Sequence, residues 1–152
     1  MTHIERILCP IDFAPSTSSL LEEVADLARQ LGAELHLLHV FENTYYNIPA
    51  GIDASAGYPG ALLDADRRYK EQLRQQLEEA AAPYAEGDLT VHTRLSEGRA
   101  AETIVAIADE EKFGLIAMGT HGRTGVQHLL IGSVAERVVR TAHCPVLTIR
   151  LH

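Results

Sequence analysis

Five short apolar runs are spread along the chain, and each has the length of a β-strand. Residues 7–11 form a nearly unbroken apolar run, which is typical of a strand covered on both faces in a parallel sheet. Residues 35–40, 115–118 and 145–151 supply three further strands. Residues 89–95 alternate apolar with polar side chains, and this alternation predicts a half-exposed strand at an edge of the sheet.

The segments between these runs carry apolar residues at helical intervals. In the first segment, the serines and threonine at residues 16–19 offer N-caps, and Ser19 has capping-box spacing with Glu22. Gly32 is expected to end this helix at its C′ position. Pro83 marks the expected end of a long second helix, and Gly98 the start of the third. The apolar residues that define the four helices are, in chain order, Leu20, Val24, Leu27, Ala28 and Leu31; Leu62, Tyr69, Leu73, Leu77, Ala80 and Tyr84; Ala101, Ile104, Val105 and Ala108; and Val134, Ala135, Val138, Val139 and Ala142.

The alternation of strands and helices predicts the fold class. We expect an α/β fold with an open, doubly wound, parallel five-stranded sheet of the Rossmann type and helices on both faces. The length of 152 residues fits a single domain that spans residues 1–152. A sheet of this kind binds its ligand at the carboxyl ends of the strands, where strand order reverses, most simply between the first and fourth strands. Asp12 follows the first of these strands and Gly119 follows the fourth.

Residues 41–60 show no hydrophobic periodicity and contain several prolines and glycines. A loop of this length is usually functional or mobile. Because it leaves the carboxyl end of a strand, it is placed to fold over a bound ligand, and the alternative is a variable solvent loop.

A glycine-rich segment separates the fourth strand from the last helix. Gly119, Gly122, Gly132 and Ser133 give it the spacing G-x2-G-x9-G-S, which differs from the P-loop and dinucleotide fingerprints. Glycines let the backbone approach phosphate oxygens closely, and the first turn of a helix points unpaired N–H groups at an anion. The spacing therefore indicates a phosphate site, although glycines that only turn the chain are the alternative.

This loop, the aspartate at position 12 and the closing run at residues 143–147 together resemble the ATP-binding branch of the universal stress protein family. The resemblance covers nearly the whole chain, and it implies the adenine nucleotide α-hydrolase-like version of the fold. It also implies which residues contact ATP. The positions that match the family's base and ribose contacts are Pro10, Ile11, Asp12, Val40, Met118 and Gly119, and those that match its phosphate contacts are Gly119, Gly122, Gly132, Ser133 and Val134.

Three side chains near this loop have two interpretations each. Asp12 is expected to hydrogen-bond the nucleoside, and otherwise to cap an Asx turn. His121 and Arg123 lie inside the loop and are candidate donors to the phosphates. The alternative is that both are surface residues without a role.

Charge narrows the choice of partner. The formal net charge of −8 argues against nucleic acid, because nucleic acids are bound by basic faces. A single nucleotide remains possible, since backbone amides, a helix dipole and a divalent metal can hold its phosphates. We therefore expect ATP with Mg²⁺ or Mn²⁺ held mainly through the phosphates, and no metal bound by side chains.

His36 and His39 have an odd spacing on their strand, so they face opposite sides and are interpreted as packing or hydrogen-bonding residues.

The chain contains no apolar run long enough to cross a membrane, and a cytoplasmic protein is expected. Cys9 and Cys144 lie in apolar strand-like contexts, which indicates buried, reduced thiols.

The predicted function is an adenine-nucleotide-binding module for stress-response signalling or protection, with slow or no ATP turnover. No nucleophilic triad is evident, and no lysine stands in the loop to neutralise a γ-phosphate. One alternative is an ATP-hydrolysing or adenylyl-transferring enzyme on the same sheet, and another is a ligand-free dimeric interaction protein. The spacing does not separate ATP from AMP or another adenine nucleotide.

The last strand suggests how the chain assembles. If it lies at an edge, its residues Val146, Leu147, Thr148 and Ile149 leave an apolar edge that no lysine or proline protects. The resemblance implies a homodimer built through this strand.

Overall fold

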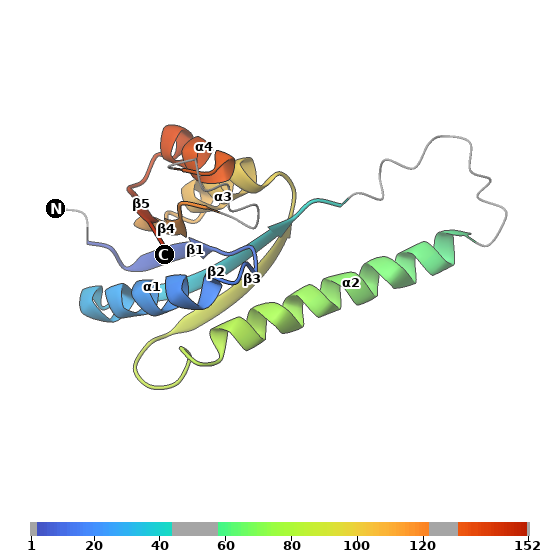
Figure 1. Ribbon diagram of the computed structural model, residues 1–152, viewed down its shortest axis with the longest axis horizontal. Helices are drawn as coiled ribbons and strands as arrows, with labels where there is room; N and C mark the ends of the chain where they lie inside the picture. Colours follow the sequence, from blue (N-terminus) through green and yellow to red (C-terminus); the bar gives the residue numbers. More distant parts are fainter. Residues whose placement is uncertain (1–2, 44–57, 122–130, 152) are drawn as a thin grey trace.

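The computed structural model describes residues 3–43, 58–121 and 131–151. Strands and helices alternate through these residues (Figure 1). Their bounds are β1 Arg6–Pro10, α1 Thr17–Leu31, β2 Glu34–Phe41, α2 Tyr58–Ala81, β3 Val91–Glu97, α3 Ala100–Glu110, β4 Leu115–Gly119, α4 Ser133–Thr141 and β5 Val146–Ile149.

The five strands form one sheet in the order β3-β2-β1-β4-β5, and every neighbouring pair is parallel. Strand β1 is central: Ile7 lies opposite Leu35 of β2 on one side and Leu115 of β4 on the other. Strand order reverses between β1 and β4. The doubly wound α/β fold is therefore confirmed, with β3 at one edge and β5 at the other.

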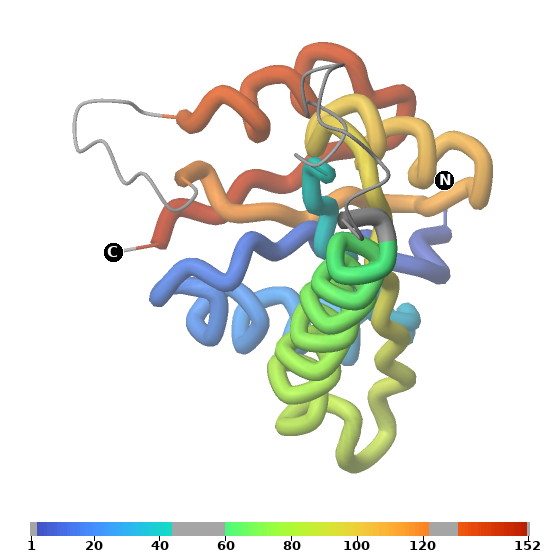
Figure 2. The backbone as a smooth tube through the Cα atoms, turned by 90° about the vertical axis from the view of Figure 1, so that its right-hand side faces the viewer, coloured from blue at the N-terminus to red at the C-terminus, as the bar shows by residue number. Residues whose placement is uncertain are grey.

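Helices cover both faces of the sheet (Figures 1 and 2). On one face, Ile7 and Cys9 pack with the buried sides of α1 and α2. On the other, Leu8 and Ile116 pack with the buried sides of α3 and α4. Alternate residues of β1 thus belong to two separate cores, which is why its sequence reads as an unbroken apolar run.

Both cysteines are free thiols among the described residues. Burial raises the pKa of Cys9 to about 12, so this thiol stays protonated at neutral pH. Cys144 is half-buried, and burial raises its pKa as well. Because the thiolate is the reactive form, neither environment favours cysteine chemistry.

The start of α1 lies within the serine-threonine cluster that the sequence offers as N-caps. The helix begins at Thr17 with Ser16 as its N-cap, without a side-chain cap hydrogen bond, so Ser19 of the capping-box pair lies inside the helix. The reason lies in the preceding turn, where the N–H of Thr17 donates to the carbonyl of Ala14 at 2.9 Å and starts the helical turn early. The predicted end is confirmed, since Gly32 adopts the left-handed conformation at φ 65°.

Several predicted core positions prove to be exposed. In α4 only Ala135 and Val138 are buried, whereas Val139 is 49% exposed, because the short helix rests on α3 along a narrow stripe. The first turns of α2 project beyond the sheet (Figure 1), and the buried residues of this helix begin at Leu73. Periodicity identified these helices correctly but overestimated the width of their buried faces.

No helix among the described residues is long and apolar enough to cross a membrane.

Two glycine substitutions test how the helix ends are specified. An added methyl group at Gly32 would meet no atom within 4 Å, but the residue sits at φ +65°. Gly32→Ala should therefore lower the free energy of unfolding by about 1–2 kcal/mol through backbone strain alone. Gly60 also has open space around it, without a positive φ and inside α2. Gly60→Ala should raise stability by roughly 0.5 kcal/mol.

Equilibrium urea unfolding of the two variants beside the parent chain makes the comparison. If Gly32→Ala left stability unchanged or raised it, the assignment of a left-handed helix end at position 32 would be wrong.

Candidate functional site

A cavity of about 270 Å³ lies at the carboxyl ends of β1 and β4, where strand order reverses. This volume is near the lower end of the range of about 300–1,000 Å³ found for small-molecule sites. Ten of the twelve predicted site residues line it, whereas Gly122 and Arg123 lie outside the described residues. The ten are Pro10, Ile11, Asp12, Val40, Met118, Gly119, His121, Gly132, Ser133 and Val134.

The structure adds residues that the sequence reading missed. They come mainly from the first turns of α1 and α3, which begin at the same edge of the sheet because each helix follows a parallel strand. A signal for Ser16 and Thr17 was present, since a serine-threonine cluster follows Asp12 directly. The added lining residues are Ser16, Thr17, Leu20, Ala100, Ile104, Thr120, Ala135 and Leu151.

A tight turn after β1 positions Asp12. Its Oδ1 accepts a hydrogen bond from the N–H of Ala14 at 3.1 Å, which is the Asx-turn arrangement. Phe13 follows at φ 57°, an uncommon conformation for a residue with a bulky side chain. The Phe13 ring packs on His39 with 4.5 Å between centroids, and His39 Nδ1 donates to the carbonyl of Ile11 at 2.8 Å. Asp12 therefore serves the turn and also lines the cavity.

The first turn of α4 borders the cavity from the other side. Gly132 is the N-cap and has no side chain to close the turn, and its own N–H donates to the carbonyl of Thr120. The first N–H groups of any helix lack partners inside the helix. In α4 these groups belong to Ser133, Val134 and Ala135, all of which line the cavity. The helix therefore presents amide donors and the positive end of its dipole to this space.

Thr120 links this turn to the end of the sheet. It is only 8% exposed, and its N–H donates to the carbonyl of Ile149 at 3.0 Å. Its hydroxyl contacts Nδ1 of His121 at 3.0 Å. This contact orients His121, which lines the cavity and is one of the candidate phosphate donors named from the sequence.

The lining divides into two chemical zones. Ile11, Val40 and Met118 present apolar surface at the strand ends, whereas hydroxyls and amides gather around the starts of α1 and α4. Among the described residues, the lining contains no lysine or arginine. An anion here would therefore be held mainly by backbone dipoles and hydroxyl groups.

The cavity lies where the order of the parallel strands reverses, and the first turn of a helix borders it. This arrangement is the one in which doubly wound α/β proteins bind ligands. The chain belongs to the universal stress protein family, since the profile of that family matches residues 3–150.

Relatives share both the sequence and the architecture. Universal stress protein MJ0531 of Methanocaldococcus jannaschii is 32% identical over 147 residues, which cover 96% of this chain and 82% of that protein. The solved structure of MJ0577, another universal stress protein of that organism, superposes with a TM-score of 0.82 at 24% identity, covering 99% of both chains. A universal stress protein from Archaeoglobus fulgidus, solved in complex with dAMP, has a TM-score of 0.66 at 18% identity and covers 97% of this chain and 99% of its own. The fold is therefore common to proteins with quite different sequences.

Proposed function

We propose that this chain binds an adenine nucleotide in the cavity between β1 and β4, and that this nucleotide is ATP. The observation that carries the proposal is the position of the α4 first turn, whose amides border the cavity at the switch point of the sheet. Membership of the universal stress protein family and the dAMP complex of the Archaeoglobus fulgidus relative support it. The proposal assigns the chain to the ATP-binding branch of its family.

The nucleotide would lie along the cavity with its base on the apolar zone. Ile11, Val40 and Met118 offer surface for a purine face, and Asp12 at the end of β1 is our candidate partner for the ribose. Pro10 and Gly119 complete this end of the site.

The phosphates would lie at the start of α4. Ser133 offers a hydroxyl and a backbone N–H, Val134 a second N–H, and His121 a ring nitrogen. We further propose that Gly122 and Arg123, in the segment outside the described residues, contribute to phosphate binding. Gly132 contributes by shape, since its N–H already donates to Thr120.

A divalent ion would accompany the triphosphate. Asp12 is the one carboxylate among the described lining residues, so Mg²⁺ or Mn²⁺ would be held mainly by the phosphate oxygens. The described lining contains no lysine that could neutralise a γ-phosphate, and the Thr120 hydroxyl that contacts His121 belongs to a side chain that is only 8% exposed. We therefore propose slow or no turnover and a signalling or protective role in the cytoplasm during stress. Rapid phosphate release on adding ATP would favour the enzyme alternative.

We also propose a homodimer built through β5. This strand lies at the sheet edge, and Leu147 is 39% exposed there. The carbonyls of Pro145 and Ile149 accept hydrogen bonds from Ile116 and Thr120 of the β4 side. Backbone groups alternate in direction along a strand, so those of Val146 and Thr148 point toward the open edge, where a second copy can pair.

Two substitutions at Ser133 separate the hydroxyl from the amide. Ser133→Ala removes only the hydroxyl and should weaken ATP binding about tenfold. Ser133→Pro also removes the N–H, yet proline suits the first position of a helix, and the extended Gly132 at φ −73° and ψ 164° suits the residue before it. This variant should bind at least about tenfold more weakly again.

Isothermal titration calorimetry with Mg·ATP measures both effects. Thr141→Ala at the far end of α4, where the hydroxyl bonds the Arg137 carbonyl at 2.7 Å, is the matched control and should bind like the parent. Equal affinity of Ser133→Pro and the parent chain would refute the assigned phosphate position.

The dimer has its own test. Thr148→Pro removes an N–H that points to the open edge while leaving the bonds to β4 in place, so it should convert the dimer into a folded monomer. Light scattering after size-exclusion chromatography measures the mass. A dimer that persists in this variant would show that the subunits associate elsewhere.

A further inference from the structure

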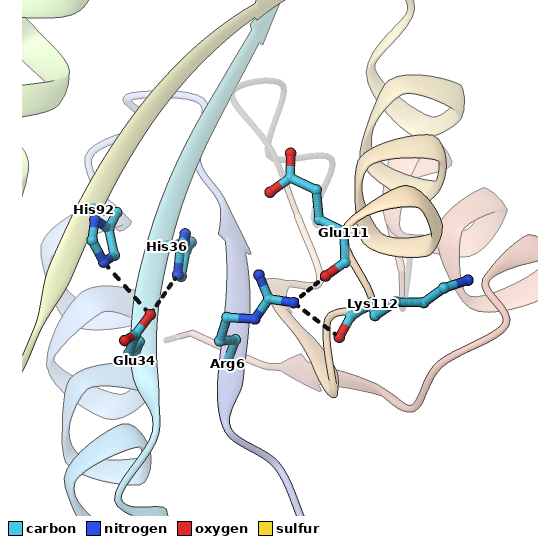
Figure 3. A network of polar contacts seen from close by, with 6 residues as sticks. All are labelled: Arg6, Glu34, His36, His92, Glu111 and Lys112. Atoms are coloured by element: carbon cyan, nitrogen blue, oxygen red, sulfur yellow. Dashed lines mark hydrogen bonds and ion pairs between the residues drawn. The ribbon is translucent and has the colours of Figure 1, made fainter.

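A cluster of three side chains, drawn in Figure 3, begins at the amino end of β2 and so lies at the opposite end of the sheet from the cavity. Glu34 and His36 are two residues apart at the start of β2, so their side chains share one face of the sheet. The parallel register places His92 of β3 directly beside His36. One side-chain ligand atom from each of the three lies within 4.8 Å of the others.

The spacing of these atoms suits a metal ion. His36 Nε2 and His92 Nε2 lie 3.3 Å and 3.5 Å from Glu34 Oε2. Zinc bonds of about 2.0–2.2 Å in tetrahedral geometry separate neighbouring ligand atoms by roughly 3.4 Å. The two imidazole rings are stacked with 4.5 Å between centroids, and both Nε2 atoms lie near the same carboxylate oxygen.

The surroundings hold one ligand firmly and leave the others accessible. The His36 ring packs against the edge of Phe113 at 4.9 Å and its side chain is 20% exposed, whereas His92 is 50% exposed and leaves a path from solvent.

The side chain of Arg6 contacts other groups. Arg6 donates to the carbonyls of Glu111 and Lys112, and its guanidinium lies 4.9 Å above the Phe113 ring. Figure 3 shows the guanidinium pointing away from Glu34 and His36. The guanidinium of Arg6 is thus hydrogen-bonded to other partners, and the net charge of −8 favours cations in general.

We propose that Glu34, His36 and His92 form a binding site for a divalent transition-metal ion of the kind that imidazole prefers, with Zn²⁺ as its representative. Two imidazoles and one carboxylate supply three ligands, and solvent completes the coordination. The site joins the edge strand β3 to β2, so an ion bound there stabilises the folded chain by linkage. It shares no residue with the nucleotide cavity, and it stands whether or not the proposed function does.

The sequence alone does not indicate this site, because the histidine that neighbours His36 on β2 is His39. These two do face opposite sides, as expected, and His39 bonds the Ile11 carbonyl. The second ligand comes from the neighbouring strand, and only the register of β2 with β3 brings it there.

Titration of the full chain with ZnCl₂, followed by calorimetry, tests the site. The parent chain should bind one ion saturably, and His92→Gln and Glu34→Gln should each weaken this binding at least about tenfold. His143→Gln is the matched control, because His143 is an exposed histidine that also contacts a carboxylate, Asp109 Oδ2, at 2.7 Å. Its affinity for Zn²⁺ should equal that of the parent.

A second readout guards against misfolding. His92 and Glu34 are about half exposed, so both variants should melt like the parent in EDTA, whereas only the parent and His143→Gln should melt higher with Zn²⁺. Absence of saturable binding by the parent, or equal binding by all four proteins, would overturn the proposal. So would a loss confined to His143→Gln.

Discussion

The reversal of strand order at β1 and β4 is the constraint on which the rest of the structure depends. Strand β1 pairs with β2 on one side and β4 on the other, and the connections that leave β1 and β4 diverge to opposite faces of the sheet. Neither connection can cover the carboxyl ends of both strands, so a cavity remains between them. The buried apolar runs of β1 and β4 hold this arrangement, since each is packed from both faces.

Much of this architecture could be predicted from the sequence because the signals are local. Unbroken apolar runs identify central parallel strands, and the glycines with Ser133 identify a strand-to-helix turn that lines a cavity. One choice that the sequence left open is made locally, since among the candidate caps at residues 16–19 the turn at Ala14 selects Ser16 and not Ser19. The lining residues that were missed depend on tertiary contacts. The lining residues from α3 could not be found, since no local pattern says which helix start reaches the cavity.

The two ends of the sheet offer different chemistry for one physical reason. The helices α1, α3 and α4 begin near the carboxyl edge, so amide donors and positive helix ends gather there. At the amino edge, register places side chains from neighbouring strands next to each other, as it does for His36 and His92. The first end suits an anion and the second suits a cation. A chain with an excess of acidic residues can thus hold phosphates at one end of its sheet without a basic surface.

The central claim is that backbone amides at the start of α4 bind the phosphates of an adenine nucleotide. Two-dimensional ¹H–¹⁵N NMR of the labelled full chain, recorded while Mg·ATP is added, tests it most directly. The account predicts that the largest shifts fall on the amides of Ser133, Val134 and Ala135, with downfield movement typical of a new hydrogen bond to an anion. Saturable binding whose shifts cluster elsewhere, and leave these three amides unchanged, would contradict it.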